Sequence, residues 1–317
     1  MKIVILDGYT TNPGDLSWDR IKQFGDVTVY DRSAPEQVSK RVDNADIVIT
    51  NKALVTKEVM DENPNIKLIT TLATGYNAID IAYAKQKGIP VSNVPGYSTD
   101  SVAQLVFAYI LHIYNKVSEL NDSVKSGGWC ASEDFSYWVS GLTALKGKTI
   151  GIVGFGSIGR AVADIAAAFK MKVLYCNRRK QPIEGLAYTY ADFETILSKS
   201  DIVTLHCPLT DETKGLINKT AIDKMKQGAL LINTSRGPVI NEHDLAEALN
   251  SGRIYAAVDV VSVEPMLKDN PLLTAKNCII TPHIGWAPRS VRESLLGIVE
   301  QNIKSFLDGS PQNVVNA

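Results

Sequence analysis

The chain has 317 residues, with 33 Lys and Arg against 34 Asp and Glu and 45% hydrophobic residues. This length predicts about two domains, and the ordinary composition excludes a disordered, collagenous or coiled-coil chain. The net charge of −1, without runs of Lys or Arg, argues against nucleic acid as a partner, because such binding needs clustered cations. The longest apolar stretch, residues 102–114, is shorter than the ~18 residues that span a bilayer. We expect no membrane partner.

The four cysteines, Cys130, Cys176, Cys207 and Cys278, are far apart and form no C-x-x-C pair. Such spacing is not typical of a zinc site or a redox dithiol, so we expect no structural metal. The first seven residues predict a strand and a turn and lack the layout of a signal peptide. A cytoplasmic protein with free thiols is the expectation.

Short β-branched runs alternate with amphipathic segments along most of the chain, a pattern that predicts βα units around parallel sheets. The first series of predicted strands covers residues 3–6, 27–30, 47–50, 68–71 and 90–92. An apolar helix that begins near Asp100 ends that series. The second series covers residues 149–153, 172–175, 201–205, 229–233, 255–259 and 278–281, with helices such as 158–169 and 242–250 between strands.

The prediction is therefore an α/β protein with two doubly wound parallel-sheet domains. The last thirty residues, from about Ala287, form one amphipathic helix and a tail that must pack on one of the two domains. Residues 127–147 show no regular pattern.

A dinucleotide motif, Gly154-Phe155-Gly156-Ser157-Ile158-Gly159, follows a predicted strand and opens an alanine-rich helix. In this spacing the first glycine turns the chain, the second lets backbone approach a pyrophosphate, and the third packs helix on strand. The amides of the helix N-terminus then face the phosphates. A tight βα turn without a ligand is the alternative, but strand, turn, helix and second strand are all in register here.

The second strand of this unit ends in Asn177-Arg178-Arg179. An NAD-selective site favours a carboxylate at this position, which would accept hydrogen bonds from the ribose hydroxyls. The sequence has Asn177 instead, followed by two arginines that could pair with the 2′-phosphate of NADP. Two solvated arginines at a strand end are an equally good interpretation.

The chain has four histidines, which are the first candidates for acid–base chemistry near neutral pH. We interpret His112, in the apolar helix, as a core residue and His243, at a helix start, as a solvated one. His206 and His283 each end a predicted strand, where ligands collect in such folds. The Pro and Gly residues around His283 make it the stronger candidate.

Charged residues follow two further strands. Arg236, after residues 229–233, could hold a carboxylate substrate through a bidentate contact. Asp259 and Glu264 follow the next strand, and one of them could orient an imidazole. Each of these residues could instead form a salt bridge or a helix cap, but three of them next to a dinucleotide motif indicate an active site.

Several segments together form a specific pattern: Ala73-Thr74-Gly75-Tyr76-Asn77, residues 153–159, His206-Cys207-Pro208-Leu209-Thr210, Asn233-Thr234-Ser235-Arg236-Gly237, residues 259–265 and Thr281-Pro282-His283-Ile284-Gly285. In these segments, and over nearly all its length, the chain resembles the D-isomer-specific 2-hydroxyacid dehydrogenases. The opening segment, residues 6–18, is similar to the glycerate dehydrogenase (hydroxypyruvate reductase) branch.

The resemblance implies a Rossmann nucleotide domain, residues 99–286, inserted into a flavodoxin-like substrate domain made of residues 1–98 and 287–317. It also implies a small 2-keto acid substrate, an NAD(P)H cofactor and a homodimer. The departure is Asn177, where many relatives have Asp, so that NADP remains plausible.

The resemblance also assigns roles to residues. His283 would exchange a proton with the C2 oxygen of the substrate, Glu264 would hold His283, and Arg236 would bind the substrate carboxylate. Backbone amides of Thr74 and Gly75 would bind the same carboxylate. The cofactor would meet Gly154, Gly156, Ser157, Ile158, Gly159, Asn177, Arg178, Arg179, Cys207, Thr234, Asp259 and Gly285.

The expected reaction is the reduction of hydroxypyruvate or glyoxylate to D-glycerate or glycolate, with D-lactate dehydrogenase as the alternative. A hypothesis of another class stays open, because the C-terminal-binding-protein corepressors retain the same triad and act chiefly as NAD-sensing scaffolds. Against it, this chain has no basic segment and no low-complexity linker for partners.

Overall fold

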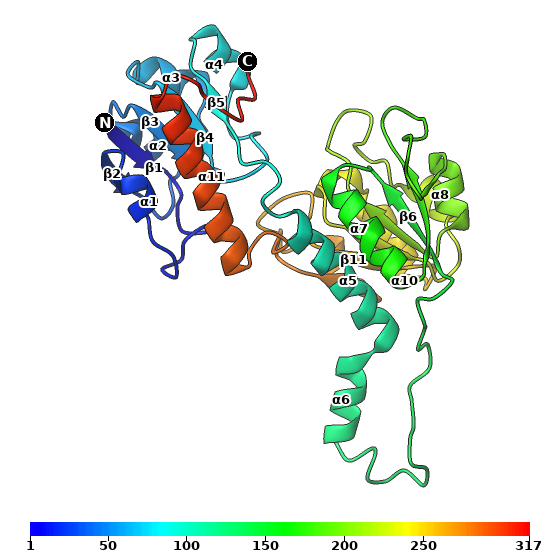
Figure 1. Cartoon of the computed structure of the whole chain (residues 1–317). Helices are drawn as coiled ribbons and strands as arrows, with labels where there is room; N and C mark the ends of the chain where they lie inside the picture. Colours follow the sequence, from blue (N-terminus) through cyan, green and yellow to red (C-terminus); the bar gives the residue numbers. More distant parts are fainter. The chain divides into compact units, whose positions relative to one another are not determined.

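The computed structural model describes all residues, 1–317, and the chain divides into two compact units. Unit 1 contains Met1–Ser98 and Trp286–Ala317, and unit 2 contains Thr99–Gly285. Each unit has its own parallel sheet with helices on both faces (Figure 1). The α/β architecture with two doubly wound parallel sheets is confirmed.

Unit 1 is built on a five-stranded sheet with the strand order β2-β1-β3-β4-β5, which is the flavodoxin-like order. Its strands are β1 (Lys2–Ile5), β2 (Asp26–Val29), β3 (Ile47–Thr50), β4 (Leu68–Thr71) and β5 (Val91–Ser92). Its helices are α1 (Asp19–Lys22), α2 (Pro35–Val42), α3 (Lys57–Glu62), α4 (Ile81–Gln86) and α11 (Arg289–Leu307).

Alternation along the strands explains why this sheet carries two cores. In β1, Ile3 and Ile5 face α1 and α11, whereas Val4 and the following Leu6 face α2, α3 and α4. The C-terminal helix α11 supplies Leu295, Leu296, Val299 and Ile303 to the first of these cores. The terminal segment therefore packs on unit 1, as its length required.

Unit 2 is built on a seven-stranded sheet with the order β12-β11-β10-β9-β6-β7-β8. Its strands are β6 (Thr149–Val153), β7 (Lys172–Cys176), β8 (Thr189–Tyr190), β9 (Ile202–Leu205), β10 (Leu230–Asn233), β11 (Tyr255–Val258) and β12 (Cys278–Ile280). The order reverses at β6, which is the first strand and lies between β7 and β9. Ligands of such sheets bind at this switch point, beyond the carboxyl ends of the strands.

Helices cover both faces of this sheet. One core includes side chains of α8, α9 and α10, and the other includes side chains of α5 and α7. The helices of unit 2 are α5 (Thr99–Asn115), α6 (Val117–Lys125), α7 (Ser157–Ala168), α8 (Phe193–Lys199), α9 (Lys219–Lys224) and α10 (Glu242–Asn250), with short 3₁₀ turns at Gly237–Val239 and Pro271–Thr274. No helix is long and apolar enough to cross a bilayer.

One expectation about α5 needs correction. His112 is exposed and not part of the core, because it lies on the outer face of α5, while Tyr109 and Ile110 are buried. Two elements were not predicted: α6, which contains no buried residue, and the two-residue strand β8. The four cysteines are free, as expected.

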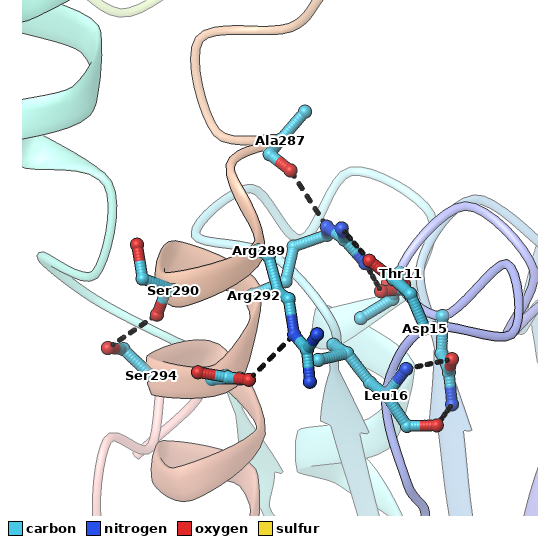
Figure 2. Close-up of polar contacts among 10 residues, drawn as sticks. Thr11, Asp15, Leu16, Ala287, Arg289, Ser290, Arg292 and Ser294 are labelled. Atoms are coloured by element: carbon cyan, nitrogen blue, oxygen red, sulfur yellow. Dashed lines mark hydrogen bonds and ion pairs between the residues drawn. The ribbon is translucent and has the colours of Figure 1, made fainter.

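A partly buried ion pair joins the beginning of α11 to the loop after β1 (Figure 2). Arg292 is 8% exposed, and its guanidinium donates to both carboxylate oxygens of Asp15, each at 2.7 Å. The same guanidinium donates to the backbone oxygens of Thr11, at 2.9 Å, and Ala287, at 2.8 Å. These contacts hold the pKa of Asp15 below its usual value, chiefly through the hydrogen bonds from Arg292.

We predict that Asp15→Asn lowers the Tm of the chain by a few degrees at pH 7 and by less near pH 3, below the usual pKa of an Asp. Since the pKa of Asp15 is lowered in the folded state, the stabilisation is fully present above about pH 4 and is lost as the pH falls through the folded pKa. Thermal unfolding of both proteins at the two pH values measures this. Asp31→Asn, which changes an exposed carboxylate without an ion pair, is the control. An equal loss of Tm at both pH values would contradict the prediction.

Candidate active site

The dinucleotide turn lies at the switch point of the unit 2 sheet, directly after β6. Gly154 has a φ of 94°, and a Cβ there would lie 2.6 Å from the backbone nitrogen of Cys207. A Cβ on Gly159 would lie 2.3 Å from the carbonyl oxygen of Gly154. Gly156 instead has open space where its Cβ would be, and it is the N-cap of α7. The turn thus leaves room at the helix N-terminus for a phosphate group, as a dinucleotide requires.

The remaining residues of the turn and its neighbours are placed as follows. Ser157 is exposed and Ile158 half-buried in the first turn of α7. Cys207 follows β9, is 9% exposed and lies against Gly154. Thr234 follows β10, where its hydroxyl lies 3.5 Å from Nδ1 of His206. These residues all belong to the carboxyl edge of the sheet near its switch point.

The end of β7 shows a local turn closed by Asn177. Its side-chain amide donates to the backbone oxygen of Gln181 at 2.8 Å, and its Oδ1 accepts from the amide of the same residue at 3.5 Å. Arg178 and Arg179 are exposed, and their guanidinium groups make no hydrogen bond or ion pair in the chain. Two cations therefore stand free beside the position where an NAD-selective site has a carboxylate.

His283 and Glu264 form a hydrogen-bonded pair at the end of the sheet. Nδ1 of His283 lies 2.8 Å from Oε2 of Glu264, and both side chains are about one-third exposed. Because a carboxylate only accepts, Nδ1 carries the proton of this bond. Nε2 of His283 has no partner in the chain and is the nitrogen open to a ligand.

His206 is not suited to donate a proton near neutral pH. Its Nε2 lies 2.9 Å from the hydroxyl of Thr204, and burial lowers the pKa of the imidazole to about 3. The ring therefore remains neutral at working pH. His243, in the first turn of α10, is exposed as expected.

Arg236 leaves the sheet on the loop after β10. Its guanidinium is exposed and donates to the carbonyl oxygen of Ser235 at 2.7 Å. The buried Asn233 holds this loop, since its amide donates to the carbonyl oxygen of Arg236 at 2.9 Å and its Oδ1 accepts from Ser235. β10, β11 and β12 are neighbours, so Arg236, Glu264 and His283 follow three adjacent strand ends.

A close backbone contact brings the Arg236 loop to the segment that carries Glu264. A Cβ on Gly237 would lie 2.0 Å from the carbonyl carbon of Val261, so only glycine fits there. The amide of Val261 in turn points to Oε1 of Glu264 at 3.3 Å. Gly237 and Asn233 are functional positions that the sequence analysis left without a role, although both stand within the matching segment.

Asp259 is deeply buried, at 3% exposure, behind His283. Its carboxylate accepts from the backbone amides of Ile284, at 2.8 Å, and Gly285, at 2.9 Å. Gly285 is itself buried, and a Cβ there would approach Oδ2 of Asp259 to 3.2 Å. The observed contacts of Asp259 are thus with the loop that carries His283.

In unit 1, Thr74 and Gly75 follow β4 at the carboxyl edge of the five-stranded sheet. The hydroxyl of Thr74 donates to the carbonyl oxygen of Val94 at 2.7 Å, and the side chain of Asn93 donates to the carbonyl oxygen of Thr74 at 2.8 Å. The amides of Thr74 and Gly75 make no hydrogen bond in the chain. Two fixed, unpaired donors therefore lie side by side there. The structure contains no group of three or more His, Cys, Asp or Glu side chains that could hold a metal ion.

Comparisons with known proteins agree with this geometry. Residues 107–285 match the family model described as D-isomer specific 2-hydroxyacid dehydrogenase, NAD binding domain. The chain is 50% identical to hydroxypyruvate reductase of Blautia hydrogenotrophica, over 100% of both chains. It is 41% identical to glyoxylate reductase of Thermococcus litoralis, over 93% of this chain and 92% of that one.

A solved structure has the same fold over the whole chain. The acyclic imino acid reductase Bsp5, in complex with NADPH and D-Arg, is 33% identical and superposes with a TM-score of 0.87 over 99% of this chain and 100% of that one. The dinucleotide turn, the family model and the full-length relatives lead to one conclusion: the chain belongs to the D-isomer-specific 2-hydroxyacid dehydrogenases, the NAD(P)-dependent oxidoreductases of 2-hydroxy acids.

Proposed function

We propose that this protein reduces hydroxypyruvate to D-glycerate and glyoxylate to glycolate. The observation that carries the proposal is the His283–Glu264 pair, with the Nε2 atom of His283 open to a ligand on the same sheet edge as Arg236. Relatives that match over their full length carry the names hydroxypyruvate reductase and glyoxylate reductase.

Gly154, Gly156, Ser157, Ile158 and Gly159 would hold the nicotinamide cofactor, whose chemistry is hydride donation, here to the C2 carbon of the keto acid. Cys207, Thr234, Asp259 and Gly285 complete the proposed cofactor site. His283 donates a proton from Nε2 to the C2 oxygen as negative charge develops there, so that a carbonyl becomes a hydroxyl. Glu264 stabilises the imidazolium before that transfer and fixes the ring's orientation.

The substrate carboxylate needs fixed donors so that the C2 carbon meets the hydride at one face only. Arg236 offers a planar guanidinium that can make two parallel hydrogen bonds. We assign Arg236 to the substrate carboxylate, so that the C2 oxygen rather than the carboxylate would meet His283. In unit 1, the unpaired amides of Thr74 and Gly75 are two further donors, and their role as carboxylate ligands stays a prediction from the family resemblance.

The test is the reduction of hydroxypyruvate by the purified protein, compared with its His283→Gln variant. We expect the variant to lower kcat by ~10²–10⁴, the effect of losing a general acid. Binding of NADH or NADPH should stay within about twofold, because no contact to the dinucleotide turn is lost. Steady-state kinetics and cofactor fluorescence titration measure the two quantities.

His243→Gln, a change of an exposed histidine on α10, is the matched control and should leave kcat unaltered. Pyruvate is offered in parallel, since a preference for pyruvate would favour the D-lactate dehydrogenase alternative. An unaltered kcat of His283→Gln would remove His283 from the reaction. A wild-type protein inactive on every 2-keto acid would overturn the proposed function itself.

We also propose that NADPH is a cofactor of this enzyme. Arg178 and Arg179 present two unpaired cations next to Asn177, which cannot repel a 2′-phosphate as a carboxylate does. A structure with the same fold contains NADPH. Both arginines are exposed, so solvent screens their attraction and the preference should be moderate.

We predict that the wild-type kcat/KM for NADPH at least equals that for NADH, and that Asn177→Asp shifts the ratio toward NADH by about tenfold. The new carboxylate would accept from the ribose hydroxyls and repel the phosphate, a difference of about 1.4 kcal/mol. Kinetics with both cofactors at a fixed keto acid concentration measures the ratio. Lys180→Gln, a neighbouring exposed cation, is the control. A strong NADH preference in the wild type would mean that both arginines contact only solvent and not the cofactor.

A homodimer is the third proposal, carried by the segment of unit 2 from Val117 to Leu142, here called the arm. The arm extends away from the seven-stranded sheet (Figure 1). Trp129, Phe135 and Trp138 are 52%, 91% and 71% exposed, and α6 buries none of its residues. Such a group of exposed aromatic side chains marks a protein interface, and a second copy of this chain is the partner that the family resemblance implies.

We predict a particle of twice the 34.5 kDa chain mass and a shift to monomer in Trp138→Asp. The introduced charge would have to be desolvated in the interface, which costs several kcal/mol if it stays unpaired. Sedimentation equilibrium over a range of concentrations measures the mass. Leu273→Asp, an exposed leucine outside the arm, should remain dimeric. A monomeric wild type would contradict the proposal.

A further inference from the structure

The backbone of His283 has a conformation that needs external support. Its φ is 56°, in the left-handed region that is unfavourable for a residue other than glycine. Its amide donates to the carbonyl oxygen of Asp259 at 2.8 Å and points to that of Thr281 at 3.0 Å. The next two amides, of Ile284 and Gly285, donate hydrogen bonds to the two carboxylate oxygens of Asp259. Asp259 therefore keeps the loop in the shape that presents the imidazole to Glu264.

The carboxylate of Asp259 is in turn fixed from its other side. The hydroxyl of Thr281 donates to Oδ1 of Asp259 at 2.5 Å, and the hydroxyl of Tyr109 is hydrogen-bonded to the same threonine oxygen. A threonine hydroxyl has one proton, and here it is given to a group that only accepts. The Tyr109 hydroxyl must consequently be the donor to Thr281. The chain of donors runs from Tyr109 through Thr281 to Asp259.

Tyr109 is well placed to act as a fixed first donor. It lies in the middle of α5, is 4% exposed and belongs to the core between α5 and the sheet. Burial raises the pKa of its phenol, so the hydroxyl keeps its proton at every working pH. Another residue of α5 holds the far end of the loop, since the hydroxyl of Ser101 donates to the carbonyl oxygen of Gly285 at 2.6 Å.

We propose that Tyr109 and Thr281 are positioning residues for proton transfer: through Asp259 they lock residues 283–285 so that His283 meets the substrate oxygen in the correct orientation. This inference rests on the proposed role of His283. Neither residue touches a reacting atom. Hydrogen bonds to a charged group are stronger than neutral ones, and a displacement of about 1 Å at a reacting group can cost a large factor in rate.

The first experiment needs no catalysis. Hydrogen exchange of a peptide that contains Ile284 and Gly285 is measured in the cofactor-free protein, in the wild type and in Tyr109→Phe. The variant keeps the ring and removes only the donor, so we expect these two amides to exchange at least about fivefold faster. Tyr114→Phe is the matched control, because Tyr114 is a buried tyrosine of the same helix whose hydroxyl has no partner in the chain. It should exchange as the wild type does.

The second experiment measures the reaction. In Tyr109→Phe we expect kcat to fall about tenfold while KM for the keto acid and for the cofactor stay within about twofold. The solvent deuterium isotope effect on kcat should rise, because proton transfer becomes slower relative to the other steps. A general loss of stability would speed hydrogen exchange throughout the chain, not in this loop alone, and would leave the isotope effect unchanged.

Thr281→Val and Thr281→Ser extend the test should Tyr109→Phe fold poorly. Valine matches the shape of threonine without a hydroxyl and should reproduce the slower, isotope-sensitive reaction, whereas serine keeps the hydroxyl and should restore the wild-type rate. Unchanged loop exchange together with an unchanged isotope effect in Tyr109→Phe and Thr281→Val would overturn the inference. Failure of the wild type to reduce any keto acid would overturn the proposed function alone, since the exchange experiment does not depend on it.

Discussion

All strands of both sheets run parallel, and this constraint determines where the chemistry lies. In a parallel sheet every strand delivers the chain to the same edge, so the loops that follow neighbouring strands meet there. The dinucleotide turn follows β6, Arg236 follows β10, Glu264 follows β11 and His283 follows β12. Parallel pairing of the strands is therefore enough to bring these residues to one edge of the sheet.

The same constraint explains what could be predicted from the sequence. Every strand except β8 (Thr189–Tyr190) was recognisable, because strands buried on both faces are near-continuous apolar runs, whereas β8 has only two residues and neither is buried. His283 could be chosen over His206 from its Pro and Gly neighbours, and the structure adds the reason: His283 occupies a left-handed turn, while desolvation keeps the half-buried His206 neutral. The family's motif residues were found because they are local in the sequence.

The features that could not be predicted depend on tertiary contacts, which join segments far apart in the sequence. His112 was misplaced because an apolar helix hides which of its faces is outward. The contact between Gly237 and Val261 joins two loops, and the relay from Tyr109 to Asp259 joins helix α5 to a strand end 150 residues later. Helix α6 buries nothing within its own chain, so it lacks the periodic core face on which such predictions depend.

The division of the chain has a consequence for biosynthesis. Unit 2 is one continuous segment and can complete its core as soon as residue 285 has left the ribosome, whereas unit 1 lacks Leu295, Leu296, Val299 and Ile303 until α11 has also been made. For the time in which roughly two hundred residues are added, one apolar face of the first sheet stays uncovered in the nascent chain. The ion pair of Arg292 with Asp15 can form only then, so the loop after β1 gains this contact long after its own synthesis.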